Sequence, residues 1–267
     1  MRITLVGCGN MGLIYARAFI KYNIVKQSEL LLVEKNEARV EEIRSLGIGE
    51  VVTPDNPAIA KSELILIAVK PQDFPELSQR LKPHLHPGIV VLSIMAGVTL
   101  SYLEKLLEHA TLVRAMPNSP AGLGMGVTAV IAHPDTSSAQ LRKAEHGLST
   151  TGRTVFMEHE SQLDAVTALS GSGPAYFFYL VKHMIEAGKA MGIEEGVAAM
   201  LVKQTMNGSF HLINQAEQSL DELIQAVASR GGTTEAAFRI FEETHLGENL
   251  QEAIFKAEQR AKELSKS

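Results

Sequence analysis

The chain has 267 residues, 45% hydrophobic and 21% charged, with a formal net charge of −5. This length suffices for one large domain or two modest ones. The ordinary composition and slight acidity argue against a nucleic acid or an anionic membrane as partner.

A cytoplasmic location is expected. The single cysteine, Cys8, cannot form an internal disulfide and fits a reducing compartment. Met1–Val6 leads directly into a strand-like segment, without the basic start and long apolar stretch of a signal peptide. The longest apolar runs, Leu64–Val69 and Ala175–Val181, are too short to span a bilayer.

Residues 1–160 alternate short apolar runs with longer amphipathic ones, the pattern of strand–helix repeats on a parallel sheet. Most of the apolar runs are continuous, as in strands covered on both faces. The expected strands are Ile3–Val6, Leu30–Val33, Leu64–Val69, Ile89–Ser93, Leu112–Arg114 and Val127–Ile131. The helical stretches between them include Met11–Tyr22, Glu37–Leu46, Leu100–Leu107 and Ala139–Leu148.

A glycine-rich turn, Gly7-Cys8-Gly9-Asn10-Met11-Gly12, joins the first expected strand to the first expected helix. In such a turn Gly7 permits the tight bend, Gly9 lets a pyrophosphate approach the backbone, and Gly12 allows helix and strand to pack closely. The free N–H groups at the helix start favour phosphates. The pattern alone also fits a structural turn, but its strand–turn–helix context predicts a dinucleotide site.

The second expected strand ends at Glu34, 22 residues beyond Gly12. An acidic residue there accepts hydrogen bonds from the adenosine ribose and repels a 2′-phosphate, which favours NADH. Lys35 and Arg39 are able to bind such a phosphate, and all three charges also fit a solvated surface. NADPH and NADH therefore both stay open, with a lean towards NADH.

Two further turns follow expected strands, Ala68-Val69-Lys70-Pro71 and Ser93-Ile94-Met95-Ala96-Gly97. Ligands of open α/β sheets bind outside the carboxyl ends of the strands, so these turns are expected to line the cofactor. Pro71 and Gly97 also fit simple loop positions.

After Ser161 every segment is typical of a helix, which predicts an all-α domain over 161–267 behind an α/β domain over 1–160. Ala175–Met191 is apolar nearly all round, so we expect it to be buried, packed against a second subunit. The expected helices are Gln162–Leu169, Ala175–Met191, Val197–Gln215, Asp221–Ala228, Thr234–Glu243 and Asn249–Leu264.

Two segments of this second half have an unusual composition. Ser170–Ala175 is expected to be a loop between helices, with Pro174 as the first residue of the next helix. Ser229–Glu235 places two glycines before a helix start, where backbone N–H groups can receive a carboxylate. A capped inter-helix turn explains the second segment equally well.

Six motifs together resemble the pyrroline-5-carboxylate reductase family in order and spacing, over essentially the whole chain. The most specific are Arg114–Pro120, Ser170–Ala175 and Gly231–Thr234. The full set is Gly7–Gly12, Ala68–Pro71, Ala96–Thr99, Arg114–Pro120, Leu169–Ala175 and Gly231–Glu235. The resemblance implies a Rossmann-like domain that binds NADPH or NADH, and a helical domain that builds a homodimer, with rings such as a decamer as a further assembly.

The activity that the resemblance implies is hydride transfer from NAD(P)H to the C=N bond of 1-pyrroline-5-carboxylate, giving L-proline in the last step of proline biosynthesis. Thr234 is then the catalytic candidate, placed to hydrogen-bond the ring nitrogen. The implied substrate-binding residues are Ser229, Gly231, Gly232, Thr233, Thr234, Glu217 and Ser172. The implied cofactor-binding residues are Val6, Gly7, Gly9, Asn10, Met11, Gly12, Glu34, Lys35, Asn56, Ala68, Val69, Lys70, Pro71, Ala96 and Gly97.

Three positions depart from the family pattern. Arg230 and Ser219 stand where proline is usual, and Glu34 stands where many members have a residue that tolerates a phosphate. Arg230 beside the carboxylate loop is able to strengthen anion binding or to change the substrate.

Other chemistries find less support. The nine histidines are scattered without HExxH spacing, and His84-Leu85-His86 lies in a proline-flanked loop typical of surface histidines, so no metal is expected. A reductase of another imine or of a hydroxy acid stays an alternative, although the pattern around Lys182 and Lys189 is not that of the hydroxy-acid enzymes. A non-catalytic dinucleotide sensor with the same fold is the second alternative.

Overall fold

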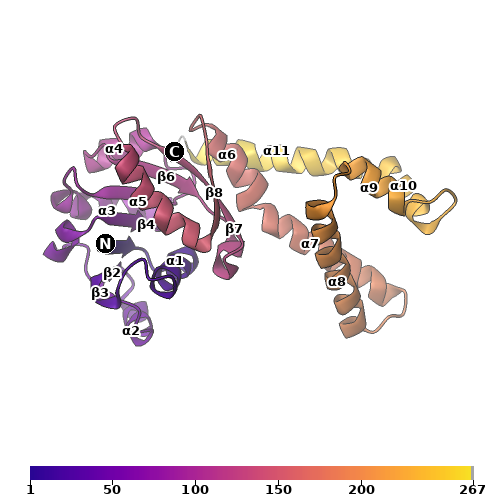
Figure 1. The fold of residues 1–267 in the computed structure, drawn as a ribbon, viewed down its shortest axis with the longest axis horizontal. Coiled ribbons are helices and arrows are strands. Elements are labelled where there is room, and N and C mark those ends of the chain that lie inside the picture. The colour runs from indigo at the N-terminus through magenta and orange to yellow at the C-terminus, as the bar shows by residue number, and fades with distance from the viewer. Residues whose placement is uncertain (266–267) are drawn as a thin grey trace. The chain divides into compact units, whose positions relative to one another are not determined.

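The computed structural model of this chain describes residues 1–265. It divides into two compact units. The first comprises Met1–Ser172 and the C-terminal segment from Ala257, and the second comprises Gly173–Lys256. Each unit is described by itself (Figure 1).

The first unit is built on one eight-stranded sheet of order β3-β2-β1-β4-β5-β6-β7-β8. All neighbouring strands are parallel except β6 and β7, which are antiparallel. The strands are β1 Ile3–Val6, β2 Leu30–Val33, β3 Glu50–Val52, β4 Leu64–Ile67, β5 Val90–Ser93, β6 Leu112–Met116, β7 Gly126–Ala132 and β8 Gly152–Phe156. Because β1 lies between β2 and β4, the carboxyl ends of these three strands meet at one edge.

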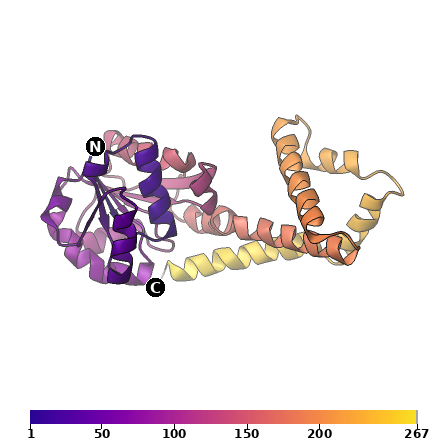
Figure 2. The ribbon, with the colours of Figure 1, turned by 90° about the horizontal axis from the view of Figure 1, so that it is seen from below.

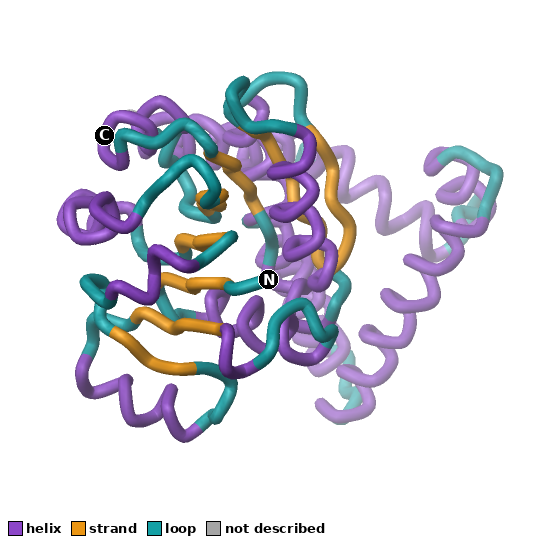
Figure 3. The backbone as a smooth tube through the Cα atoms, turned by 60° about the vertical axis from the view of Figure 1, so that its left-hand side comes forward, coloured by secondary structure: helices purple, strands orange, loops and turns teal. Residues whose placement is uncertain are grey.

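Helices cover both faces of this sheet, as Figure 3 shows. On one face Leu5 and Leu66 pack in a buried cluster with Phe19 of α1. On the other face Ile65 packs with Phe74 of α3 and with residues of α4. The helices of this unit are α1 Asn10–Lys21, α2 Glu37–Ser45, α3 Phe74–Leu81, α4 Leu100–Leu107, α5 Ser138–Leu148 and α6 Gln162–Val166. The expected Rossmann-like α/β architecture is confirmed.

Three elements of the sheet unit were not predicted from the sequence. β3 has three residues and β8 contains Arg153, so neither is a continuous apolar run. α3 contains Pro75 in its first turn, where proline is tolerated because the N–H it lacks has no helical partner. Short edge strands and short helices carry too few apolar residues to give a clear period.

The expected loop Ser170–Ala175 is wrong. α6 runs into a π-helical turn, Thr167–Gly171, and α7 (Gly173–Ala190) begins two residues later. Gly171 approaches β6 closely, since a Cβ on it would lie 2.8 Å from Cε of Met116. The glycines and serines of this segment favour a loop, but its close packing against β6 keeps it helical.

The second unit is entirely helical, as expected. It contains all of α7 and most of the last helix. Gly192 (φ 87°) lies in the turn between α7 and α8, which pack together (Figure 2). The helices after α7 are α8 Glu195–Gln215, α9 Leu220–Val227, α10 Thr233–Glu243 and α11 Leu246–Leu264. Among the described residues, no helix is both long and apolar enough to cross a membrane.

In the single chain the apolar helix α7 is not buried, so its expected burial depends on a second subunit. Phe177, Phe178 and Tyr179 of α7 are 56%, 68% and 63% exposed. Exposed aromatic side chains in succession indicate a surface that another molecule covers.

Candidate functional site

The glycine-rich turn has the geometry that a dinucleotide needs. Gly7 adopts a φ of 96°, and a Cβ on it would lie 2.8 Å from the carbonyl carbon of Ala68. A Cβ on Gly12 would lie 2.0 Å from the backbone oxygen of Gly7. A Cβ on Gly9 would meet nothing within 4 Å. Gly7 and Gly12 are therefore required by packing, while Gly9 faces open space.

The start of α1 is suited to an anion. Its N-cap is Gly9, which has no side chain to accept the first N–H groups, and the first turn contains no acidic residue. Asn10, Met11 and Gly12 form that turn, so their N–H groups precede the first intrahelical bonds. The positive end of the helix and its N–H groups fit the pyrophosphate of a dinucleotide.

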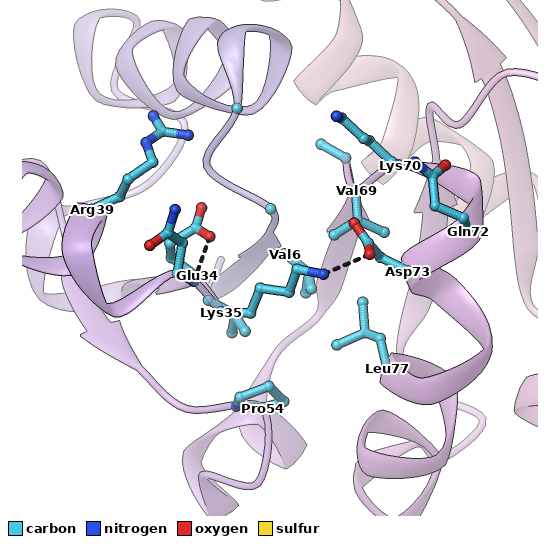
Figure 4. Close-up of a pocket in the computed structure, with 15 residues that line it drawn as sticks. Val6, Glu34, Lys35, Arg39, Pro54, Val69, Lys70, Gln72, Asp73 and Leu77 are labelled. Carbon is cyan, nitrogen blue, oxygen red and sulfur yellow. Dashed lines mark hydrogen bonds and ion pairs between the residues drawn. The ribbon is translucent and has the colours of Figure 1, made fainter.

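A cavity of about 480 Å³ lies beside this turn, at the carboxyl ends of β1, β2 and β4 (Figure 4). Eight of the predicted cofactor residues line it: Val6, Gly7, Gly9, Glu34, Lys35, Ala68, Val69 and Lys70. They come from separate parts of the chain, and the sheet order brings them together.

Glu34 is held at the rim of this cavity by backbone donors. Its Oε2 accepts a hydrogen bond from the N–H of Cys8 at 3.2 Å, and its Oε1 accepts one from the N–H of Asn36 at 2.9 Å. The carboxylate is thus fixed where the ribose of a dinucleotide on the Gly7–Gly12 turn is expected.

Two of the three cations that line the cavity, Lys35 and Arg39, are already engaged. Lys35 Nζ donates to Oδ1 of Asp73 at 2.5 Å, and this hydrogen bond raises the pKa of the lysine. Arg39 donates to the backbone oxygen of Cys8 at 3.0 Å. Figure 4 shows the Lys35 side chain extending towards Asp73 on the opposite wall.

The sequence reasoning missed part of the cavity lining. Pro54, which follows β3, and Leu77 of α3 belong to or adjoin elements that had not been predicted. Asp73 precedes α3 and was missed for the same reason. A proline just inside a helix, after an acidic N-cap candidate, is the signal that would have found α3.

Asn56 does not line this cavity. Its Oδ1 accepts from the N–H of Ala58 at 2.9 Å and so caps a short 3₁₀ turn, Pro57–Lys61.

Pro71, Ala96 and Gly97 line a second cavity, of about 810 Å³, within the same unit. Gly97 has a φ of 74°, and a Cβ on it would lie 3.0 Å from the backbone oxygen of Leu264. The end of α11 therefore packs directly on this turn, an approach that only glycine allows.

Arg114, the first residue of the motif Arg114–Pro120, belongs to a buried ionic network. The side chain of Arg114 is 4% exposed and donates to Oε1 of Glu160 at 2.9 Å, with Asp164 at 3.8 Å. The same Glu160 oxygen accepts from the N–H of Leu100 at 2.7 Å, at the start of α4. Ser265 Oγ donates to Asp164 at 2.9 Å. The network ties β6, α4, α6 and the chain's C-terminal segment together.

The candidate carboxylate loop lies in the helical unit, between α9 and α10. Gly231 has a φ of 74°, and its N–H donates to Glu235 at 2.6 Å. A Cβ on Gly232 would lie 2.7 Å from Oγ of Ser229, so the loop is folded tightly. Ser229, Gly231, Gly232, Thr233 and Thr234 are thus brought together at the start of α10.

Two predicted substrate residues, Glu217 and Ser172, are not part of this loop. Glu217 precedes α9, whereas the loop follows it, and this helix of eight residues is about 12 Å long. Ser172 belongs to the first unit, where its N–H donates to the carbonyl of Thr167 at 2.9 Å.

Ser219, one of the departures from the family pattern, has a structural role. It is the N-cap of α9 in a capping box, where Ser219 Oγ accepts from the N–H of Glu222 at 3.3 Å. The Glu222 carboxylate in turn accepts from the N–H of Ser219 at 2.8 Å. Arg230 is exposed.

Comparison with known proteins decides the family. Residues 160–264 match the model for pyrroline-5-carboxylate reductase dimerisation, and residues 2–97 match the model for coenzyme F420-dependent NADP oxidoreductases. The pyrroline-5-carboxylate reductase of Pseudomonas aeruginosa is 34% identical over 265 residues, which cover 99% of this chain and 97% of that protein. This chain belongs to the pyrroline-5-carboxylate reductase family. The predicted resemblance is confirmed.

Solved structures of pyrroline-5-carboxylate reductases agree with this assignment. The enzyme from Coxiella burnetii is 31% identical with a TM-score of 0.87, over 100% of this chain and 99% of that one. The pyrroline carboxylate reductase of Plasmodium falciparum, solved with NADP bound, has a TM-score of 0.89 at 23% identity, over 99% and 98% of the two chains. The latter likeness shows the shared fold. Within the family, the helical segment of this chain is the region of self-association.

Proposed function

We propose that this chain reduces 1-pyrroline-5-carboxylate to L-proline with NADH or NADPH, the last step of proline biosynthesis. The observation that carries the proposal is its 34% identity, over nearly its full length, to a pyrroline-5-carboxylate reductase. Residues 1–160 serve as the dinucleotide domain, and residues 161–267 serve for dimerisation and substrate binding. The reaction takes place in the cytoplasm.

The first domain binds and orients the dinucleotide. The N–H groups at the start of α1 hold the pyrophosphate, and Glu34 accepts hydrogen bonds from the ribose hydroxyls. When bound, the reduced nicotinamide supplies a hydride for the C=N carbon of the substrate. Because Glu34 is a fixed carboxylate that repels a 2′-phosphate, NADH is the preferred form.

The loop before α10 receives the substrate. The hydroxyl of Ser229 and backbone N–H groups of Gly231 and Gly232 bind the substrate carboxylate. To do so, the N–H of Gly231 exchanges Glu235 for the substrate, and the N–H of Gly232 exchanges the carbonyl of Ser229. The hydroxyl of Thr234 hydrogen-bonds the ring nitrogen and orients it. A protonated imine is already electrophilic, so the residues need to supply position and electrostatics but no dedicated acid.

The active form is a homodimer. The exposed aromatic side chains of α7 need a partner surface, and the matched dimerisation model spans this helix. A ring of dimers, such as a decamer, is the higher assembly to look for. Light scattering tests this, since one chain has a mass of 29.0 kDa and a monomer of that mass would contradict the proposal.

The decisive test is oxidation of NADH and of NADPH with and without 1-pyrroline-5-carboxylate. Substrate-dependent turnover supports the proposal, and binding of nucleotide without any turnover supports a sensor. Thr234→Ala is expected to lower kcat, whereas Thr234→Ser retains the hydroxyl and most of the activity. Unchanged kcat and KM in Thr234→Ala would remove this residue from the mechanism.

A further inference from the structure

We propose that Asp73 is a specificity-determining residue: by holding Lys35, it withdraws a cation from the adenosine ribose site and so disfavours a dinucleotide with a 2′-phosphate. The inference rests on the proposed use of a nicotinamide dinucleotide. It assigns a role to a residue that lies 38 positions from its partner in the chain.

The ion pair joins two walls of the cavity. Lys35 is the second residue after β2, next to Glu34, whereas Asp73 ends the short 3₁₀ turn Pro71–Asp73 after β4. Their side-chain atoms are 2.5 Å apart, and both residues line the cavity (Figure 4). The lysine is 66% exposed and the aspartate 28%, so the pair lies where a nucleotide has access.

Asp73 does not serve the purpose that its position suggests. It stands at the N-cap of α3, where an aspartate ordinarily accepts hydrogen bonds from the first backbone N–H groups. Its side chain makes no such bond, and its carboxylate instead accepts from Lys35. Pro75, in the first turn of the helix, lacks an N–H to donate. The carboxylate is thereby left for the lysine.

Two other cations line the cavity, Lys70, which follows β4, and Arg39, on the same side as Lys35. Arg39 is bound to the backbone oxygen of Cys8 at 3.0 Å and lies 3.7 Å from Glu42. Glu34 places a second carboxylate beside Lys35. A 2′-phosphate carries up to about two negative charges, but it must displace Asp73 from Lys35 before it gains that cation. A dinucleotide with free ribose hydroxyls has no such cost.

The test compares Asp73→Asn with the double variant Asp73→Asn/Lys35→Met. Glu63→Gln is the matched control, because Glu63 forms a similar lysine–carboxylate pair, with Lys143 at 2.9 Å, before the start of β4 and away from the cavity. The dissociation constants of NADH and NADPH are measured by nicotinamide fluorescence, alongside kcat/KM with 1-pyrroline-5-carboxylate.

In Asp73→Asn, the ratio of NADPH affinity to NADH affinity is expected to rise about fivefold, the size of one exposed ion pair. In the double variant this gain is lost, and in Glu63→Gln the ratio stays as in the original chain. An unchanged ratio in Asp73→Asn, or a gain that persists without Lys35, overturns the inference. If NADH and NADPH bind but 1-pyrroline-5-carboxylate is not reduced, the proposed function is wrong. The ratio of the two nucleotide affinities still tests the role of Asp73.

Discussion

The carboxylate of Glu34 and the backbone N–H of Cys8 are 3.2 Å apart and share a hydrogen bond. This bond joins the end of β2 to the turn between β1 and α1. Glu34, which is expected to bind the ribose, is therefore hydrogen-bonded to the Gly7–Gly12 turn, which is expected to bind the pyrophosphate. A second hydrogen bond, from the N–H of Asn36, fixes the other carboxylate oxygen.

Replacing Glu34 with Gln is expected to raise the ratio of NADPH to NADH affinity by roughly tenfold, the effect of removing one nearby like charge. The amide nitrogen of glutamine also cannot accept the second backbone N–H, so NADH binding weakens. Fluorescence titration with both nucleotides measures the ratio. Glu37→Gln, an exposed residue of α2 outside the cavity, is the control and should leave the ratio unchanged.

Substitutions at Gly12 and at Gly9 are expected to have different effects, the first on folding stability and the second on nucleotide binding. Gly12→Ala is expected to destabilise the fold by about 1–3 kcal/mol, because its Cβ would overlap the carbonyl oxygen of Gly7. Gly9→Ala has room within the chain and should unfold like the original, yet weaken NADH binding about tenfold by blocking the pyrophosphate. Urea unfolding and nucleotide titration measure the two effects. Equal loss of stability in both variants would contradict this division of roles.

Arg114→Met is expected to reduce the free energy of unfolding by about 3–5 kcal/mol, because it leaves Glu160 and Asp164 without their buried cation. Chemical denaturation measures the loss. Arg153→Met, an exposed arginine of β8, is the matched control and should change stability little. A similar small change in both variants would mean that the network contributes nothing to folding.

Cys8 is expected to be unreactive in the folded chain. Burial, and secondarily the charge of Glu34, raises the pKa of its thiol from 9.0 to about 12. A thiol reagent at pH 8 should therefore label the chain only after denaturation. Rapid labelling of the folded chain would show that the turn opens in solution.

The raised pKa of Cys8 also predicts that the stability of the fold depends on pH. Between pH 9.0 and about 12 the unfolded chain loses the Cys8 proton while the folded chain keeps it. This term favours unfolding, so its contribution to stability declines as pH rises through that window and is constant below it. Cys8→Ala should lose less stability than the original chain between pH 9 and pH 10.5 in urea unfolding. If the stability of Cys8→Ala and of the original chain fell equally over this pH range, the raised pKa of Cys8 would be contradicted.

The prediction of secondary structure succeeded where the chain has a local period. β1, β2 and α4 have the expected bounds. A continuous apolar run, or apolar residues at helical spacing, shows within a few residues which side chains are buried. The π-helical turn at Thr167–Gly171 was missed because the close approach of Gly171 to Met116, 55 residues away, outweighs the local preference for a loop.

The glycine-rich turn, the acidic end of the second strand and the likeness to a family of reductases can all be read from the amino-acid sequence. These features are local, or are ordered motifs, and need no knowledge of which segments meet. The pairing of Lys35 with Asp73 and of Arg114 with Glu160 becomes visible in the folded chain alone. A charge pairs with the partner that folding brings within reach. The position of β1 between β2 and β4 brings Lys35 near Asp73, and the packing of α6 on β6 brings Glu160 near Arg114.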